Sequence, residues 1–173
     1  MNSKPPTPWA ELAFVALGSN LGDSRALMNR ALADLQSLSD QPLLQSSLWQ
    51  TTPVDCPPGS PSFLNAVAGL VPRADETPET LLARLQRMES AFGRQPRQVR
   101  NEPRPLDLDL LTFKSEVRAT ATLTLPHPRA HLRRFVLEPL NEIAPDCILP
   151  RQTKSVRQLL AELATDEVVS RII

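Results

Sequence analysis

The chain has 173 residues, of which 41% are hydrophobic and 22% are charged, and this composition indicates one globular domain with a buried core. Nineteen Lys and Arg residues balance 19 Asp and Glu residues, so nothing in the net charge indicates a polyanion-binding surface. The longest apolar run, residues 12–17, is too short for a membrane-spanning helix, which needs about 20 residues.

The cysteines and the first residues favour a cytoplasmic protein. Cys56 and Cys147 lie far apart and form no C-x-x-C pair, which argues against a disulfide framework or a zinc site. Residues 1–8 contain no apolar core segment, so we expect no signal peptide. We therefore expect a cytoplasmic protein, and the balanced charge and short apolar runs favour neither nucleic acid nor membranes as partners. We also expect a monomer.

The first part of the chain alternates strand and helix signals. Residues 13–17 are apolar and end at a Gly-Ser-Asn turn, which predicts a buried strand. Asp23 is a candidate N-cap for a helix whose apolar residues recur at helical spacing as far as Leu38. Residues 43–51 predict a weakly patterned strand, and residues 53–61, with four prolines and a glycine, predict a stiff loop.

The later part of the chain begins with another strand and helix. Residues 63–71 alternate between two faces and predict a strand, while Thr77-Pro78 opens a helix that Gly93 closes. Residues 94–104 are basic and broken by prolines, which predicts a long loop. A strand, a hairpin and two helices are then expected at residues 106–113, 116–125, 132–140 and 156–163.

The order β-α-β-β-α-β predicts an α+β fold. Its expected form is a ferredoxin-like antiparallel sheet with helices packed on one face and a C-terminal extension. We place a single domain at residues 11–165, with flanking tails at residues 1–10 and 166–173.

Two acidic residues stand out in the strand at residues 106–113. Because side chains alternate along a strand, Asp107 and Asp109 share one face, with Cβ atoms roughly 7 Å apart, and the leucines between them face the core. Two carboxylates this close repel each other unless a cation lies between them, and Mg²⁺ combines carboxylates with water and phosphate oxygens. The alternative is a strand with one solvated acidic face.

Arginines flank the acidic pair on both sides in the chain. They are Arg94, Arg97, Arg100, Arg104, Arg129, Arg133 and Arg134. Guanidinium groups present forked donors that match phosphate oxygens, so arginines beside a carboxylate pair favour a polyphosphate site. The alternatives are a solvated surface loop or nonspecific contact with nucleic acid, and the zero net charge disfavours the latter.

Four further residues have both a functional and a structural interpretation. His127 is held between two prolines, which suits either contact with a ligand or a structural role. Phe63 and Asn65 share a strand face, where a ring beside an amide would suit a flat heteroaromatic ligand, although an isolated Phe belongs more often to the core. Glu89 lies off the apolar stripe of its helix, where a solvent-facing role is common.

Several blocks of sequence occur together in a specific order. They are Leu17-Gly18-Ser19-Asn20-Leu21, Phe63-Leu64-Asn65-Ala66, Gly93-Arg94, Pro103-Arg104-Pro105-Leu106-Asp107-Leu108-Asp109, Leu125-Pro126-His127-Pro128, Arg133-Arg134-Phe135 and Glu142-Ile143-Ala144-Pro145. Through these blocks, about residues 13–150 resemble the 6-hydroxymethyl-7,8-dihydropterin pyrophosphokinase family of folate biosynthesis.

This resemblance implies transfer of the terminal pyrophosphate of ATP to the hydroxymethyl group of the pterin, with release of AMP. It implies two Mg²⁺ ions bound by Asp107 and Asp109, and catalytic roles for these two residues, Arg94 and Arg104. The ATP site it implies consists of Gln86, Glu89, Arg94, Arg97, Arg104, Leu110, Thr124, His127 and Arg133. The pterin site it implies consists of Thr51, Pro53 and Val54 on the ring edge, Phe63 and Phe135 on its two faces, and Asn65.

The chain departs from the family pattern at three places. Asn101-Glu102 stand where many relatives carry Trp-Gly, Pro96 stands where a second loop arginine is usual, and Pro128 replaces an aromatic residue. Two other functions fit the layout. One is a kinase that moves a single phosphoryl group and releases ADP, and the other is a non-catalytic ferredoxin-like module that binds a nucleotide or a protein partner.

Overall fold

The computed structural model describes residues 8–96 and 98–172. Its helices are α1 (Ser24–Gln36), α2 (Pro78–Ala91), the 3-10 helix η1 (Ala130–Leu132), α3 (Arg134–Ile143) and α4 (Val156–Glu162). Its strands are β1 (Ala13–Ser19), β2 (Leu44–Gln45), β3 (Trp49–Thr51), β4 (Phe63–Leu70), β5 (Asp107–Phe113), β6 (Arg118–Ala119), β7 (Thr124–Leu125) and β8 (Val169–Arg171).

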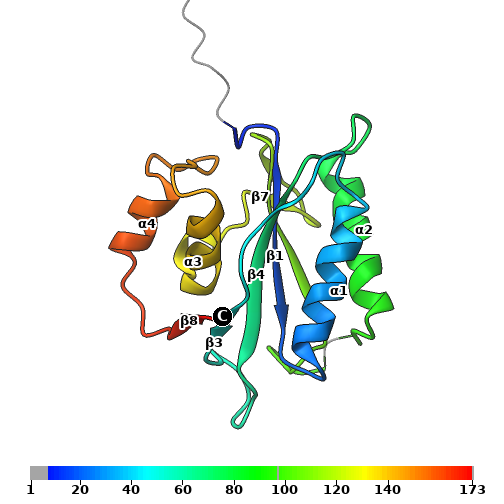
Figure 1. Ribbon diagram of the computed structural model, residues 1–173, viewed down its shortest axis with the longest axis vertical. Coiled ribbons are helices and arrows are strands. Elements are labelled where there is room, and N and C mark those ends of the chain that lie inside the picture. Colours follow the sequence, from blue (N-terminus) through cyan, green and yellow to red (C-terminus); the bar gives the residue numbers. More distant parts are fainter. Residues whose placement is uncertain (1–7, 97, 173) are drawn as a thin grey trace, which may run out of the picture.

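The main sheet runs in the order β5-β1-β4-β3-β8, with β2 also pairing with β4. Every pair in it is antiparallel. The long strands β1 and β4 form its centre (Figure 1). This arrangement confirms the expected α+β class and the ferredoxin-like antiparallel sheet.

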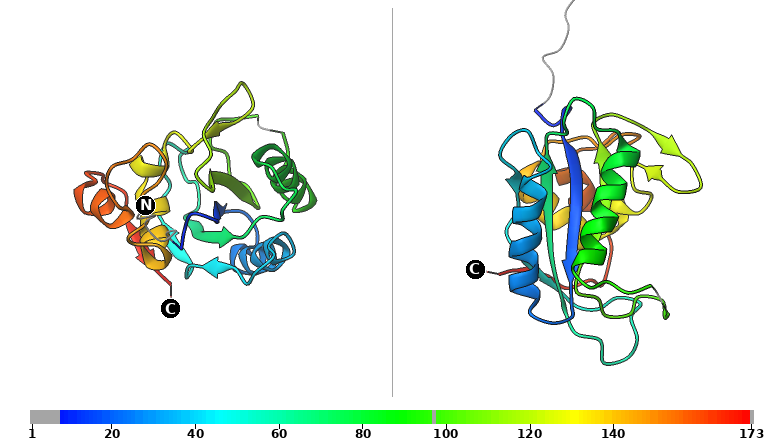
Figure 2. Two further views of the ribbon diagram at one scale, coloured as in Figure 1. Left: turned by 90° about the horizontal axis from the view of Figure 1, so that it is seen from above. Right: turned by 90° about the vertical axis from the view of Figure 1, so that its right-hand side faces the viewer.

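Helices cover both faces of this sheet. Helices α1 and α2 lie side by side on one face, as expected, and α3 and α4 lie on the other (Figures 1 and 2). The C-terminal extension therefore supplies a second helical layer that the sequence pattern did not place. The residues that face this second layer from the sheet are Phe14, Val67 and Leu111.

Side-chain alternation in β5 follows the expectation. Leu106, Leu108 and Leu110 are buried in the core beneath α1 and α2. Asp107 and Asp109 are only partly buried, and both line a cavity on the opposite side of the strand. The strand thus has one apolar face and one acidic face, as a period of two requires.

The helix ends follow from local chemistry. The Asp23 side chain accepts a hydrogen bond from Ala26 N at 3.1 Å, which caps α1. Thr77 and Thr80 form a capping box at the start of α2, and Gly93 follows the helix with a positive φ of 88°.

The expected strand at residues 43–51 is interrupted. Residues 46–48 separate β2 from β3. Within this gap the side chain of Ser46 accepts a hydrogen bond from Val67 N at 3.0 Å. A side chain therefore takes part in the pairing at this point. The helix expected at residues 132–140 begins instead at Arg134 and continues to Ile143, after the 3-10 turn η1.

Residues 166–173 were expected to be a flanking tail. Residues 169–171 instead form strand β8, with Val169 opposite Thr51 and Arg171 opposite Trp49. The sheet therefore extends past the domain boundary expected at residue 165. At the other end, residues 1–7 lie outside the described residues, while Trp9 packs against the second helical layer.

Within residues 8–96 and 98–172, none of the helices has the length and apolar character needed to cross a bilayer.

Candidate active site

A cavity of about 350 Å³ opens on the acidic side of β5. It is lined by residues from the central strands, the loops at residues 52–61 and 94–104, and the start of α3. Twelve residues singled out from the sequence line it: Thr51, Val54, Phe63, Asn65, Arg100, Arg104, Asp107, Asp109, His127, Arg129, Arg133 and Phe135. Segments far apart in sequence thus bring the acidic pair, four arginines, one histidine and two aromatic rings to one place.

Small residues on β1 keep the space between β4 and β5 open. Gly18 lies opposite Asp107 on one side and Asn65 on the other, and Ala16 lies opposite Asp109. A Cβ atom at Gly18 would lie 3.3 Å from Oδ1 of Asn65, which is a tight contact. The glycine of the Leu-Gly-Ser-Asn block therefore leaves this amide its place beside the cavity.

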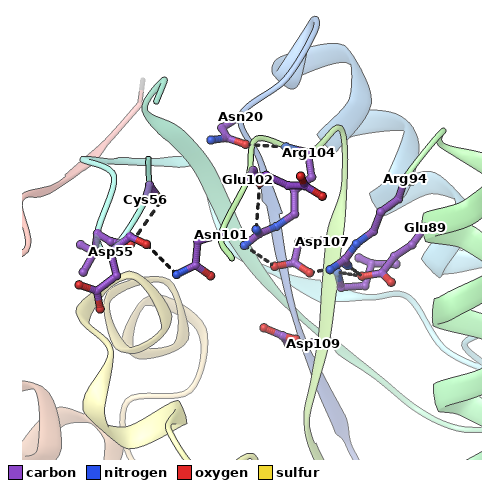
Figure 3. A network of polar contacts seen from close by, with 12 residues as sticks. Asn20, Asp55, Cys56, Glu89, Arg94, Asn101, Glu102, Arg104, Asp107 and Asp109 are labelled. Atoms are coloured by element: carbon purple, nitrogen blue, oxygen red, sulfur yellow. Dashed lines mark hydrogen bonds and ion pairs between the residues drawn. The ribbon is translucent and has the colours of Figure 1, made fainter. Parts of the chain in front are cut away.

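Asp107 is held by two arginines (Figure 3). Nη1 of Arg94 lies 2.6 Å from Oδ1 of Asp107, and Nη2 of Arg104 lies 3.0 Å from Oδ2. Arg94 also pairs with Glu89, whose carboxylate accepts a hydrogen bond from Leu108 N at 2.7 Å. Helix α2, the basic loop and β5 are therefore joined by one chain of charged contacts.

Asp109 has a weaker partner. Nη1 of Arg133 lies 3.8 Å from its Oδ2 atom. Burial and the charge of Asp107 raise the pKa of Asp109 to about 6. Burial also raises the pKa of Glu89 to about 7, in spite of its contact with Arg94. Burial thus disfavours the charged forms of both carboxylates, and a cation bound beside Asp109 would offset that effect.

The donor set fits Mg²⁺. Among the described residues, no group of three or more His, Cys, Asp or Glu side chains is arranged to hold a metal ion. A cation beside Asp107 and Asp109 would therefore need further oxygen ligands from water or from a substrate. This is the usual coordination of Mg²⁺ in phosphate-binding sites, where one or two carboxylates suffice.

His127 is neutral at pH 7. Burial and the charges of Arg133 and Arg129 lower its pKa to about 4. Nδ1 accepts a hydrogen bond from Arg129 N at 3.2 Å, which assigns the ring proton to Nε2. The structural and ligand-binding interpretations of this residue are thus compatible, because one nitrogen fixes the ring and the other remains a donor beside the cavity.

Two aromatic rings border the cavity, each under a guanidinium group. Arg104 lies over Phe63 at 5.3 Å from the ring centroid, and Arg133 lies over Phe135 at 5.4 Å. The buried amide of Asn65 donates a hydrogen bond to Oγ1 of Thr51 at 2.9 Å, so its orientation is fixed. Rings and a fixed amide are suited to a flat ligand with polar edges.

The other expected residues lie elsewhere. The Leu110 side chain is in the hydrophobic core and does not line this cavity. Gln86 and Thr124 are exposed and, like Pro53 and Glu89, do not line the cavity. Arg94 borders a second cavity of about 210 Å³ behind the basic loop. Arg97 lies outside the described residues.

Several residues at the cavity were not expected. They are Ala16, Leu17, Gly18, Thr52, Asp55, Cys56, Asn101, Leu132 and Glu167. Asn101 could have been identified as a site residue from the sequence, because it is a polar residue in the basic loop. In the structure it donates a hydrogen bond to the backbone oxygen of Asp55 at 2.9 Å (Figure 3). Glu167 could not have been identified in this way, since an acidic residue near the end of the chain is normally solvated.

Comparison with known proteins gives consistent matches. The family model described as 7,8-dihydro-6-hydroxymethylpterin-pyrophosphokinase (HPPK) matches residues 14–145. A Haemophilus influenzae protein named 2-amino-4-hydroxy-6-hydroxymethyldihydropteridine pyrophosphokinase is 36% identical over 158 residues, which cover 91% of this chain and 96% of that protein. A Pseudomonas aeruginosa protein of the same name is 39% identical over 138 residues, which cover 79% of this chain and 83% of that protein.

Solved structures support the fold. The structure of Plasmodium falciparum HPPK-DHPS, wild type with pteroate, matches with a TM-score of 0.67 and 12% identity over 87% of this chain. This chain covers 44% of that longer chain, so it spans less than half of it. The likeness therefore concerns the fold of one part of that protein.

Proposed function

Since the chain belongs to the 7,8-dihydro-6-hydroxymethylpterin pyrophosphokinase family, we propose that it catalyses the reaction for which the family is named. The hydroxymethyl oxygen of 6-hydroxymethyl-7,8-dihydropterin attacks the β-phosphorus of ATP, and the bond from that phosphorus to the oxygen of the α-phosphate breaks. AMP leaves, and the hydroxyl proton is released to solvent. The observation that carries this proposal is the convergence of Asp107, Asp109, Arg104 and Arg133 on a cavity bordered by two aromatic rings, with Arg94 paired to Asp107 beside it.

Mg²⁺ is part of the proposal. Asp107 and Asp109 would hold two ions together with the phosphate oxygens of ATP, and a cation there would stabilise the charged form of Asp109, which burial disfavours. When bound, the metal supplies charge neutralisation for the phosphates as the pyrophosphoryl group moves. The aspartates supply the fixed positions, because both are anchored in the central sheet.

The arginines carry the phosphate contacts in this proposal. Arg94 and Arg104 hold Asp107 in the structure, and both guanidinium groups have further N–H groups for phosphate oxygens. The buried Nε atom of Arg104 has no hydrogen-bond partner among the described residues. Neutral His127 offers Nε2–H to the same charged group. Transfer of this kind depends on positioning and charge stabilisation.

The pterin is proposed to lie between Phe63 and Phe135. The Asn65 amide, with its NH₂ group already bonded to Thr51, keeps its oxygen as an acceptor for the ring. The backbone of residues 51–54 would meet the ring edge. The aromatic faces would shield the hydroxymethyl group from water and orient it toward the phosphates.

The test is product identity. Purified protein is incubated with Mg²⁺, ATP and 6-hydroxymethyl-7,8-dihydropterin, and the products are resolved by phosphorus NMR, with an EDTA control. The proposal predicts one AMP per pyrophosphorylated pterin, formed only with metal. Formation of ADP would identify the single-phosphoryl kinase instead, and ATP binding without turnover would identify a non-catalytic module.

A further inference from the structure

The end of the chain forms part of the wall of the candidate active site. Residues 163–172 pass from α4 across the start of α3 to strand β3, with which β8 pairs. Arg134 donates a hydrogen bond to Leu163 O at 3.3 Å, and Thr52 N donates to Val168 O at 3.3 Å. The segment is thus attached to two elements that carry proposed pterin residues, α3 and the β3 end.

Glu167 connects this segment to α3 directly. Its Oε2 atom accepts a hydrogen bond from Phe135 N at 3.2 Å, and its own N–H donates to Oγ1 of Thr165 at 3.3 Å. Within the described residues, Arg133 at the N-cap of α3 makes no side-chain capping bond. An acceptor 32 residues further along the chain therefore satisfies one of the free N–H groups of the first turn.

This contact lies at the cavity as well as at the end of the helix. Glu167, Phe135 and Arg133 line the same cavity. The carboxylate is bonded to the backbone of Phe135, the residue whose ring borders the cavity. Its influence on the neighbouring Arg133 is weaker than that of Asp109 and Asp107. Loss of the bond would therefore act mainly on the Phe135 ring.

We propose that Glu167 is a positioning residue that holds Phe135 against the pterin ring and so sets the affinity for the pterin and not for ATP. This inference depends on the proposed function, because it takes Phe135 as one face of the pterin site. A simple helix cap predicts a change in stability alone. A positioning role predicts a change in the affinity for one substrate.

The first experiment measures pterin and ATP dissociation constants, and the KM for each substrate, for Glu167→Ala and wild-type protein. Loss of the hydrogen bond is expected to weaken pterin binding about tenfold, as for one charge-assisted hydrogen bond, and to change ATP binding less than twofold. Glu167→Gln keeps an acceptor oxygen and is expected to recover most of the affinity. Asp166→Ala, at an exposed neighbouring acid, is the matched control and is expected to behave as wild type.

The second experiment tests whether the effect passes through Phe135. In a Phe135→Leu background, Glu167→Ala is expected to weaken pterin binding less than twofold further, because the ring that it positions is gone. If Glu167→Ala does not fold, Glu167→Asp, which keeps the charge on a shorter side chain, takes its place in both experiments.

Unchanged pterin affinity in Glu167→Ala would overturn the inference, as would equal weakening of both substrates together with a lower melting temperature. Full additivity with Phe135→Leu would also overturn it. Each of these results leaves AMP formation by wild-type protein intact. Failure of the proposed function would appear separately, as wild-type protein that forms no AMP.

Discussion

Asn20 and Arg104 are joined by two hydrogen bonds. The N–H of Asn20 donates to Arg104 O at 3.1 Å, and the N–H of Arg104 donates to Oδ1 of Asn20 at 2.9 Å. Asn20 is 3% exposed and lies just after β1, so it ties the end of the basic loop to the central sheet. The backbone of Arg104 is thereby fixed, and this places its guanidinium group next to Asp107.

Replacement of Asn20 is expected to affect both stability and turnover. Asn20→Ala leaves a buried N–H without its acceptor and should lower the free energy of unfolding by about 1–3 kcal/mol. It should also reduce kcat/KM, because Arg104 is released. Asn20→Asp keeps the acceptor and should retain more activity than Asn20→Ala. Urea unfolding and steady-state kinetics measure both effects, and wild-type kinetics in a folded Asn20→Ala protein would refute the role of this tie.

Arg94 is expected to be needed for turnover. Arg94→Lys retains the charge but loses the fork that reaches Glu89 and Asp107, so kcat should fall roughly a hundredfold, as when a preorganised donor is removed. Arg73→Ala is the matched control, because its pair with Asp40 is exposed and spans 4.0 Å. Rapid-quench measurement of AMP formation would reveal the difference. Equal rates for Arg94→Lys and the control would be incompatible with the proposed phosphate contacts.

Asn101 links the two loops that border the cavity. Its backbone has a positive φ of 55°, and its side chain donates a hydrogen bond to the backbone oxygen of Asp55. Asp55 also has a positive φ, of 50°. Asn101→Gly tolerates this backbone conformation and loses only the bond, so KM for the pterin should rise about fivefold. Asn101→Ala adds backbone strain and should raise KM further. If Asn101→Gly keeps the KM of wild type, the bond between the loops is unimportant for binding.

His127 gives a pH-dependent contribution to stability. Its folded pKa of about 4 lies below the ordinary value of 6.5, so the unfolded chain binds the proton first as the pH falls. Stability from the neutral ring is present above pH 6.5 and is lost as the pH falls toward 4. The raised pKa values of Asp109 and Glu89 act in the opposite direction, with stability that decreases as the pH rises through 6 to 7.

A comparison with His127→Gln isolates the contribution of the histidine. Wild-type protein should exceed the variant in unfolding free energy at pH 7.5, and this difference should shrink steadily between pH 6.5 and 4.5. Urea unfolding at several pH values measures it. A difference that does not change with pH would show that the ring is not held neutral.

Much of the fold could be predicted because the information is local. Alternation in β5 placed Asp107 and Asp109 on one face, and Thr77 and Gly93 marked the limits of a helix. Strand β8 could not be predicted, since three residues without an apolar pattern become a strand only by pairing with β3.

The candidate site was predictable to a similar extent. The motif residues converge on one cavity, but the bond from Phe135 to Glu167 depends on how the chain returns past α4. The hydrogen bond from Leu108 N to Glu89 likewise depends on α2 lying beside β5. Neither contact has a signature in the local sequence, because each joins elements brought together only by folding.

The most direct measurement compares AMP formation and thermal stability in wild-type protein and Asp109→Asn. Burial raises the pKa of Asp109 to about 6, so its charge opposes folding above that pH, and the neutral amide should leave the melting temperature at pH 7.5 unchanged or higher. The same change removes a proposed magnesium ligand. We predict a fully folded variant whose Mg²⁺-dependent AMP formation falls at least a hundredfold, roughly the loss expected when charge stabilisation of the transition state is removed. AMP formation at the wild-type rate in that folded variant would contradict the proposed role of the acidic pair.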